Sequence, residues 1–218
     1  MADPVKGKTE AGRRREQNAH RTRARVAAAA LRLFLEHGYL ATTVEAIARE
    51  AGVAPATVYQ AFGTKQAVLA RALDTTIVGD AAAVALLDRD WVATARRQRS
   101  ARRRLESVVR QAARVAARTA PLKGVMRDAA ATDPQVRELI REDHRRRRAT
   151  QQALVELAFG KESPSPGGSN DRAVDTFFLL VNSDTYTMAT EILGWTDDEW
   201  QRWLVEVLTR QLADDSAR

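Results

Sequence analysis

The stretch 42–65, TTVEAIAREAGVAPATVYQAFGTK, restricts the possible folds of this chain more than any other part. Thr42 and Glu45 have the spacing of a capping box, in which a hydroxyl and a carboxylate each satisfy a free backbone group where a helix begins. Gly52 is expected to close this helix and Pro55 to open the next, because glycine suits helix ends and proline suits first turns. The spacing predicts a helix-turn-helix, whose second helix enters the major groove of DNA.

The composition predicts that the rest of the chain is also helical. Hydrophobic residues make up 44% of the 218 residues, much of that share is alanine, and strand-forming runs are missing. Cysteine is absent, which excludes disulfides, thiolate metal sites and a cysteine nucleophile. No apolar run approaches the roughly 20 residues that span a bilayer, and the charged N-terminus has no apolar segment behind it. We therefore expect an all-α, cytoplasmic protein without a membrane partner.

The net charge of +7 is concentrated at the N-terminal end. Residues 1–65 hold 11 lysines and arginines against 6 acidic residues, and the remainder holds 24 against 22. This asymmetry indicates a nucleic-acid partner, because phosphate contacts by basic groups dominate such affinities. The alternative is a solvated basic surface without a partner. The first 20 residues are expected to form a flexible basic arm, which either contacts DNA or serves only as a solubilising tail.

The helix-turn-helix is preceded by another well-signalled helix. Thr22 is its expected cap, Leu33 and Phe34 lie on its apolar face, and Gly38 follows its end at His37. Leu33 and Phe34 are expected to pack on the two helices that follow, which gives a three-helix module. The arginines near its start, Arg21, Arg23 and Arg25, could reach phosphates.

The residues in this region carry a resemblance to a known family. The matching segments are 22–26 (TRARV), 33–34 (LF), 38–39 (GY), 41–44 (ATTV), 47–48 (IA), 51–53 (AGV), 55–59 (PATVY), 62–63 (FG) and Lys65. Together they resemble the DNA-binding domain of the TetR family of bacterial transcriptional regulators. The resemblance implies a homodimer, usually a repressor that a small-molecule effector releases from its DNA operator. Two departures from the family pattern are Ala54, where a Ser or Thr cap is common, and Gln60-Ala61, where bulkier residues are common.

With this resemblance, the chain divides into three expected parts. They are a basic arm at 1–20, a TetR-type helix-turn-helix domain at 21–66, and a helical ligand-binding and dimerisation domain at 67–214. Gln60 is the best candidate for base readout, because a side-chain amide can pair with adenine. The resemblance assigns phosphate contacts to Tyr59 and Lys65. The full set of expected DNA-binding residues is Thr42, Thr43, Pro55, Ala56, Thr57, Tyr59, Gln60 and Lys65.

The C-terminal part reads as a series of helices with one loop. We expect helices at 65–78 and 100–118, a short one at 121–126, and a longer one from Pro134 to Phe159 with Asp133 as its cap. The last of these contains Arg145 to Arg148, which sweep about 300° of a helix. Either one of these four arginines points into the domain, or all are solvated.

The last two helices are expected to form the dimer interface. Residues 161–170 have the composition of a flexible loop. The helix expected at 171–193 has an apolar surface too broad for one groove, and Thr196 with Glu199 forms a second capping box that starts the final helix. Such a pair suits a four-helix bundle between two copies.

An effector pocket is expected in this C-terminal part. Polar residues that interrupt an apolar helix can orient a ligand, although they can equally be structural or interface groups. The aromatic and methionine candidates can equally be plain core. The candidate pocket residues are Trp91, Met126, Phe177, Phe178, Asn182, Asp184 and Tyr186.

Catalysis, a metal site and a cofactor are not expected. His20, His37 and His144 share no ligand spacing with carboxylates, and no phosphate-binding glycine loop or nucleophile elbow is present. The main rival to a regulator is an all-helical ligand carrier or enzyme without DNA-binding function. A third possibility is an architectural protein that coats DNA without sequence preference.

Overall fold

The computed structural model describes residues 10–79, 86–160 and 170–213, and every regular element within these ranges is a helix. This confirms the predicted all-α class. The loop expected over 161–170 lies outside the described residues, except that Asn170 begins a helix. The chain divides into two compact units, Met1–Leu73 and Asp74–Arg218.

The N-terminal unit contains α1 (Glu10–Ala41), α2 (Val44–Ala51), α3 (Pro55–Phe62) and most of α4 (Lys65–Val78). The helical conformation of α1 is interrupted at Gly38, with φ of 78°, where the sequence predicts the end of a helix. The unit ends at Leu73, later than the predicted boundary at 66/67. Its fully buried large side chains include Phe34, Tyr39, Ile47, Leu69 and Leu73.

Helix α1 begins much earlier than the sequence predicts. The expected flexible arm extends to residue 20, but the chain is already helical from Glu10. One reason is an ion pair one turn apart, between Arg14 and Glu10 at 3.2 Å. Residues 1–9 of the arm lie outside the described residues. The basic side chains of the described part are therefore carried by a helix.

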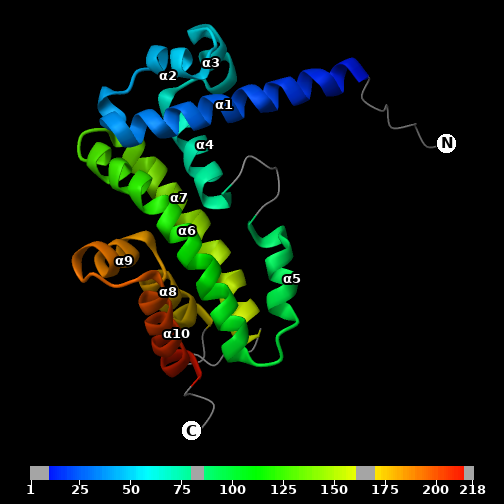
Figure 1. The fold of residues 1–218 in the computed structure, drawn as a ribbon, viewed down its shortest axis with the longest axis vertical. Coiled ribbons are helices and arrows are strands. Elements are labelled where there is room, and N and C mark those ends of the chain that lie inside the picture. Colours follow the sequence, from blue (N-terminus) through cyan, green and yellow to red (C-terminus); the bar gives the residue numbers. More distant parts are fainter. Residues whose placement is uncertain (1–9, 80–85, 161–169, 214–218) are drawn as a thin grey trace, which may run out of the picture. The chain divides into compact units, whose positions relative to one another are not determined.

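The C-terminal unit is built around two long helices. Helices α6 (Ala101–Ala130) and α7 (Pro134–Phe159) lie side by side (Figure 1). One side carries α8 (Asn170–Leu180) and α10 (Asp197–Ala213), and the other side carries α5 (Asp90–Arg96). The remaining elements are η1 (Leu86–Asp88), α9 (Ser183–Thr187) and a π-helical turn, η2 (Met188–Ile192). Trp200 and Phe177 are the largest side chains buried in its core.

Two sequence predictions about these helices are wrong. Pro121 does not start a new helix but lies inside α6, because loss of one backbone donor is outweighed by burial of Ala120, Leu122 and Met126 around it. The single helix expected at 171–193 is broken at Asn182. The side chain of Asn182 accepts hydrogen bonds from the backbone N–H groups of the next helix start and so caps α9.

Candidate functional site

The helix-turn-helix has the geometry that the sequence predicts. Gly52 adopts a left-handed conformation, with φ of 63°, and its N–H donates to the carbonyls of Ala48 and Arg49. Pro55 occupies the first turn of α3. Three residues, 52–54, therefore separate α2 from α3, which is the connection of a helix-turn-helix.

One face of α3 is open. Val58 is buried, whereas Tyr59 is 49% exposed and Gln60 beside it is also exposed. Pro55 and Ala56 are also exposed, and Thr57 is partly exposed. Ala54 provides no side-chain cap for the helix. The five predicted contact residues of α3 are therefore accessible to a ligand as large as DNA.

The two threonines before α2 have different positions from those predicted. Thr42 is only 2% exposed, and its hydroxyl donates to the carbonyls of Leu33 and Gly38 at 3.2 and 2.7 Å. Thr43 is the N-cap of α2, with its hydroxyl accepting from the N–H of Ala46 at 3.1 Å. The predicted position of the helix cap is therefore wrong by one residue, because Thr43 and not Thr42 caps α2. Of the two hydroxyls, only that of Thr43 lies at the surface.

Lys65 is also held within the N-terminal unit. Its ammonium donates to the carbonyls of Tyr39 and Thr42, each at 2.9 Å. It also lies 4.1 Å from the centre of the Tyr39 ring. This group therefore joins α4 to the end of α1, and the phosphate contact that the resemblance implies for Lys65 stays a prediction.

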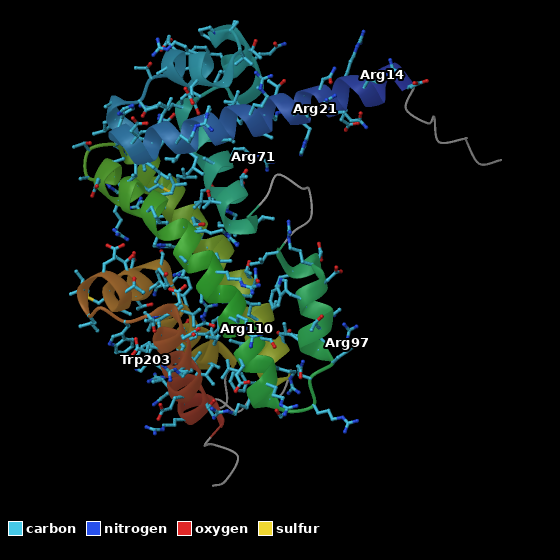
Figure 2. All side chains as sticks on the ribbon, viewed as in Figure 1. Arg14, Arg21, Arg71, Arg97, Arg110 and Trp203 are labelled. Atoms are coloured by element: carbon cyan, nitrogen blue, oxygen red, sulfur yellow. The ribbon has the colours of Figure 1, made fainter. Side chains whose placement is uncertain are left out.

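The first turns of α1 present an exposed basic surface. Figure 2 shows Arg14 and Arg21 on this part of the helix. Both side chains are exposed. Arg25, in contrast, donates to the carbonyls of Ala51 and Gly52 at the end of α2. Arg25 therefore caps α2, whereas Arg14 and Arg21 extend the basic surface available to a polyanion.

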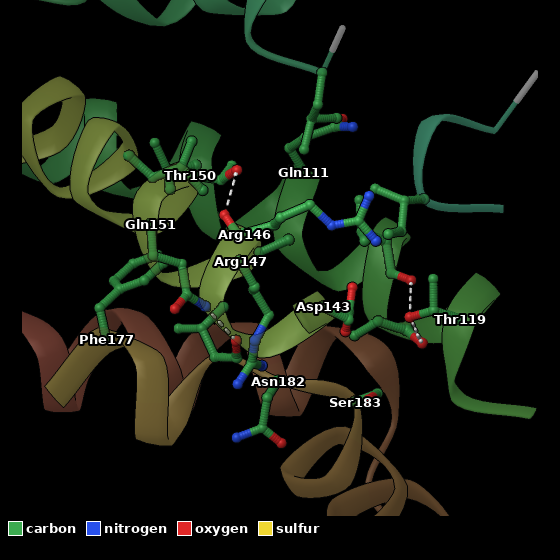
Figure 3. Close-up of a pocket in the computed structure, with 18 of the residues that line it drawn as sticks. Gln111, Thr119, Asp143, Arg146, Arg147, Thr150, Gln151, Phe177, Asn182 and Ser183 are labelled. Atoms are coloured by element: carbon green, nitrogen blue, oxygen red, sulfur yellow. Dashed lines mark hydrogen bonds between the residues drawn. The ribbon is translucent and has the colours of Figure 1, made fainter. Parts of the chain in front are cut away.

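The C-terminal unit encloses a cavity of about 220 Å³ between its helices. Its walls come from the end of α4, from η1 and α5, and from α6, α7 and α8 (Figure 3). Most of the wall is apolar, with Trp91, Phe177 and Val108 among its larger side chains. A cavity of this size can hold a small organic molecule.

The predicted pocket residues divide into three groups: those that line this cavity, those that line a neighbouring cavity, and those that line neither. Trp91, Phe177 and Asn182 line this cavity. Met126 and Asp184 line a smaller neighbouring cavity of about 90 Å³, which Asn182 shares.

Phe178 and Tyr186 line neither of these two cavities. The Phe178 ring stacks on the guanidinium of Arg147, and its edge faces His144. The Tyr186 ring packs on Trp200, and its hydroxyl donates to Asp197 at 2.6 Å. Burial and the Asp197 carboxylate raise the pKa of Tyr186 to about 12.

Sequence reasoning missed most of the charged groups of the cavity. Lys123 pairs with the buried Asp143 at 3.1 Å, and Arg146 pairs with Asp74 at 3.5 Å. Arg147 also lines the wall. The run from Arg145 to Arg148 was the sequence signal for a charged group in the cavity, since four consecutive residues of a helix cannot all face solvent equally.

The four arginines of that run point in four directions. Arg145 pairs with Glu138 at 3.0 Å, Arg148 pairs with Asp175 at 2.8 Å, and Arg146 reaches Asp74 on α4. Arg147 is more buried than Arg146 and turns into the domain, with its guanidinium carbon 3.8 Å from the centre of the Phe178 ring. Of the two alternatives for this run, the structure supports the inward-pointing arginine.

The last turn of α4 forms part of the wall of the same cavity. Asp74 and Ile77 line it, and Arg118 of α6 donates to the carbonyls of Thr76 and Ile77 at 3.2 and 2.9 Å. These carbonyls are among the last of α4, which have no partners within the helix. A change in the shape of the cavity would therefore act directly on the end of α4.

A group of large apolar side chains is exposed near the C-terminal end. Leu179, Met188, Ile192 and Leu193 are each more than half exposed. They lie at the end of α8 and in the π-helical turn that precedes α10. The predicted Thr196–Glu199 capping box is present, with the carboxylate of Glu199 accepting from the Thr196 N–H at 2.8 Å. Exposed apolar groups of this kind mark interaction surfaces.

Among the described residues, no group of three or more His, Cys, Asp or Glu side chains could hold a metal ion. Within the same residues, no helix is both long enough and apolar enough to span a membrane.

Comparison with known proteins assigns the helix-turn-helix to a family. The family model for bacterial regulatory proteins of the tetR family matches residues 26–72. None of the curated proteins compared with the chain matches it.

Solved structures of similar fold cover nearly the whole chain. A transcriptional regulator from Saccharomonospora viridis, in complex with choline, is 19% identical, with a TM-score of 0.61 over 87% of this chain and 96% of that one. NalD from Pseudomonas aeruginosa, the secondary repressor of the MexAB-OprM multidrug efflux pump, is 19% identical, with a TM-score of 0.63 over 89% and 97%. FadR from Bacillus subtilis, in complex with stearoyl-CoA, is 16% identical, with a TM-score of 0.60 over 84% and 96%. Residues 26–72 therefore form a domain of the kind that defines the tetR family of bacterial regulatory proteins, and the solved structures show that the whole chain shares the fold of such regulators.

Proposed function

We propose that this regulator is a dimeric repressor that binds an operator through α2 and α3 and leaves it when a small molecule enters the cavity of the C-terminal unit. The observation that carries the proposal is the cavity wall, which includes Asp74 and Ile77 of α4. Helix α4 begins in the DNA-binding unit and ends at this wall. An occupant of the cavity therefore contacts an element that is continuous with the DNA-binding unit.

The open face of α3 supports the first half of the proposal. Gln60 would read a base edge, and the Tyr59 hydroxyl would contact a phosphate. The exposed arginines at the start of α1 would add phosphate contacts that carry no sequence information. Because DNA is the partner, the proposed place of action is the cytoplasm.

The exposed apolar group at the end of α8 and in the following turn supports the dimer. A second copy would cover Leu179, Ile192 and Leu193, which a single chain leaves open. Two bound copies would present two α3 helices to half-sites related by two-fold symmetry. The Saccharomonospora viridis regulator and FadR, which share this fold, each bind a small molecule, and this supports the proposal that the present cavity also binds one.

Gel-shift titration against DNA upstream of the protein's own gene tests the DNA-binding part. Gln60→Ala is expected to weaken binding to the preferred site by about 1–3 kcal/mol and to relax base preference. Tyr59→Phe is expected to weaken binding to all sequences similarly. Gln135→Ala, at an exposed glutamine of α7, is the matched control and should bind as the wild type does.

The same titration separates the rival functions. A repressor loses affinity steeply as salt rises and keeps a preference for its operator over competitor DNA. A ligand carrier or an enzyme would show no salt-dependent DNA affinity. An architectural protein would show salt dependence without sequence preference, and either of these last results would refute the proposal.

A further inference from the structure

The charges around the cavity do not balance. Asp143 and Asp74 are the acidic side chains of its described wall, and each already has a cationic partner, Lys123 and Arg146. Asp184, which lines the smaller neighbouring cavity, is paired with Arg127. After these pairs are counted, the positive charge of Arg147 remains.

Arg147 has no acceptor among the residues that the structure describes. Its Nε is buried and makes no hydrogen bond, and its guanidinium lies against the Phe178 ring. Figure 3 shows the side chain extending from α7 toward Asn182. Burial lowers the pKa of Arg147, and the carboxylates of Asp143 and Asp184 only partly oppose this effect. Arg147 is partly buried, and a cation removed even partly from water without an acceptor is costly unless another group pairs with it.

A second unsatisfied group lies one turn further along α7. Gln151 is 4% exposed and lines the cavity, and its amide nitrogen donates to the carbonyl of Val181 at 3.0 Å. Its amide oxygen is buried and accepts no hydrogen bond. Residues four apart lie on the same helix face, so both unsatisfied groups face the same region. The guanidinium of Arg147 requires an anionic acceptor, and the amide oxygen of Gln151 requires a hydrogen-bond donor.

We propose that the cavity binds a small hydroxylated organic acid, with its carboxylate on Arg147, its hydroxyl on Gln151 and its apolar body against Trp91 and Phe177. The inference rests on the proposed effector function and adds the chemical class of the effector. Scaled from benzene, whose six carbon atoms fit a cavity of about 150 Å³, the ligand has on the order of ten non-hydrogen atoms. Aromatic walls favour an aryl group as the apolar body.

Three related probes test the chemical class on the free protein, without DNA. Mandelate carries the acid and the hydroxyl, phenylacetate lacks the hydroxyl, and mandelamide lacks the charge. Calorimetric titration is expected to give the tightest binding for mandelate. Mandelamide is expected to bind about tenfold to a hundredfold more weakly, because a charge-assisted hydrogen bond is lost. Phenylacetate should fall between the two.

Variants then test the assigned residues. Arg147→Gln should abolish the preference for mandelate over mandelamide, and Gln151→Leu should abolish the preference for mandelate over phenylacetate. Arg145→Gln is the matched control, because it removes an exposed arginine of the same run and should change neither preference. Circular dichroism and thermal melting of each variant show whether it folds. Arg147→Gln is expected to melt no lower than the wild type.

Several results would overturn the inference. They are no binding of either acid at millimolar concentration, equal or tighter binding of mandelamide, or an acid preference that survives in folded Arg147→Gln. The function proposed above is tested separately, by adding mandelate to the gel shift. Charge-dependent binding without release of DNA would support this inference and contradict effector-controlled repression.

Discussion

The ammonium of Lys65 lies 4.1 Å from the centre of the Tyr39 ring and donates to the Tyr39 carbonyl at 2.9 Å. It thereby joins α4 to the end of α1. Lys65→Met is expected to lower the free energy of unfolding of the N-terminal unit by about 1–2 kcal/mol, because charged hydrogen bonds are lost. Urea denaturation measures this change. Arg49→Met, at an exposed cation of α2, is the control and should cost much less.

The two threonines before α2 should respond differently to loss of their hydroxyls. Thr43→Ala removes a helix cap and is expected to cost about 1 kcal/mol. Thr42→Val keeps the buried volume but leaves the carbonyls of Leu33 and Gly38 without that donor, at a cost of about 1–2 kcal/mol. Denaturation measures both. Only Thr43→Ala is expected to leave the packing around Gly38 unchanged, and a cost-free Thr42→Val would contradict the structural role of that hydroxyl.

Arg118 should determine the stability of the last turn of α4. Arg118→Met removes the donor to the carbonyls of Thr76 and Ile77 and is expected to speed hydrogen exchange of the amides at 74–79 by about fivefold. Mass spectrometry of peptic fragments measures this exchange. Arg114→Met, an exposed position one turn earlier on α6, is the control. Equal exchange in the two variants would show that Arg118 does not stabilise this turn.

The exposed apolar group should determine the oligomeric state. Leu193→Glu is expected to convert dimers into single chains, because a carboxylate would be buried in the interface. Leu40→Glu makes the same change at a leucine of similar exposure, 60% against 58%, in the N-terminal unit. Sedimentation equilibrium measures the mass of each variant. A dimer that persists in Leu193→Glu, or dissociation in both variants, would place the interface elsewhere.

His144 should make stability depend on pH. Burial and the charge of Arg147 lower the pKa of His144 below 6.5, which outweighs the opposing carboxylates Asp143 and Asp184. In acid, the unfolded chain therefore binds this proton more readily than the folded chain does. Stability is expected to fall as pH decreases below about 6.5 and to be regained above it. Melting temperatures across this range should show a weaker dependence in His144→Gln than in the wild type or in His20→Gln.

Local signals in the sequence predicted the elements whose ends are fixed by nearby residues. Gly52 and Pro55 correctly placed the turn between α2 and α3, and Thr196 with Glu199 correctly started α10. The error at Thr42 arose because two adjacent threonines can both cap, and burial of one decided between them.

Elements that depend on distant contacts were less predictable. The sequence did not show that α6 continues through Pro121 or that the helix beyond α8 restarts at Asn182. The site was predicted in part: Trp91, Phe177 and Asn182 line the cavity, but its ion pairs join helices far apart in sequence. Periodicity reports which face of a helix is apolar and gives no information about which carboxylate lies opposite a given arginine.

The stretch from Arg145 to Gln152 also repeats the residue types of two positions in the cavity wall, those of Arg147 and Gln151. Insertion or deletion of one residue earlier in α7 rotates everything beyond it by about 100°. A deletion would bring Arg148 and Gln152 to the positions of Arg147 and Gln151, and an insertion would bring Arg146 and Thr150 there. In each case a guanidinium and an uncharged polar group would still face the cavity. The repeated sequence thus preserves the polar chemistry of these two positions through a shift in helical register, a redundancy that other wall residues of α7 such as Leu154 lack.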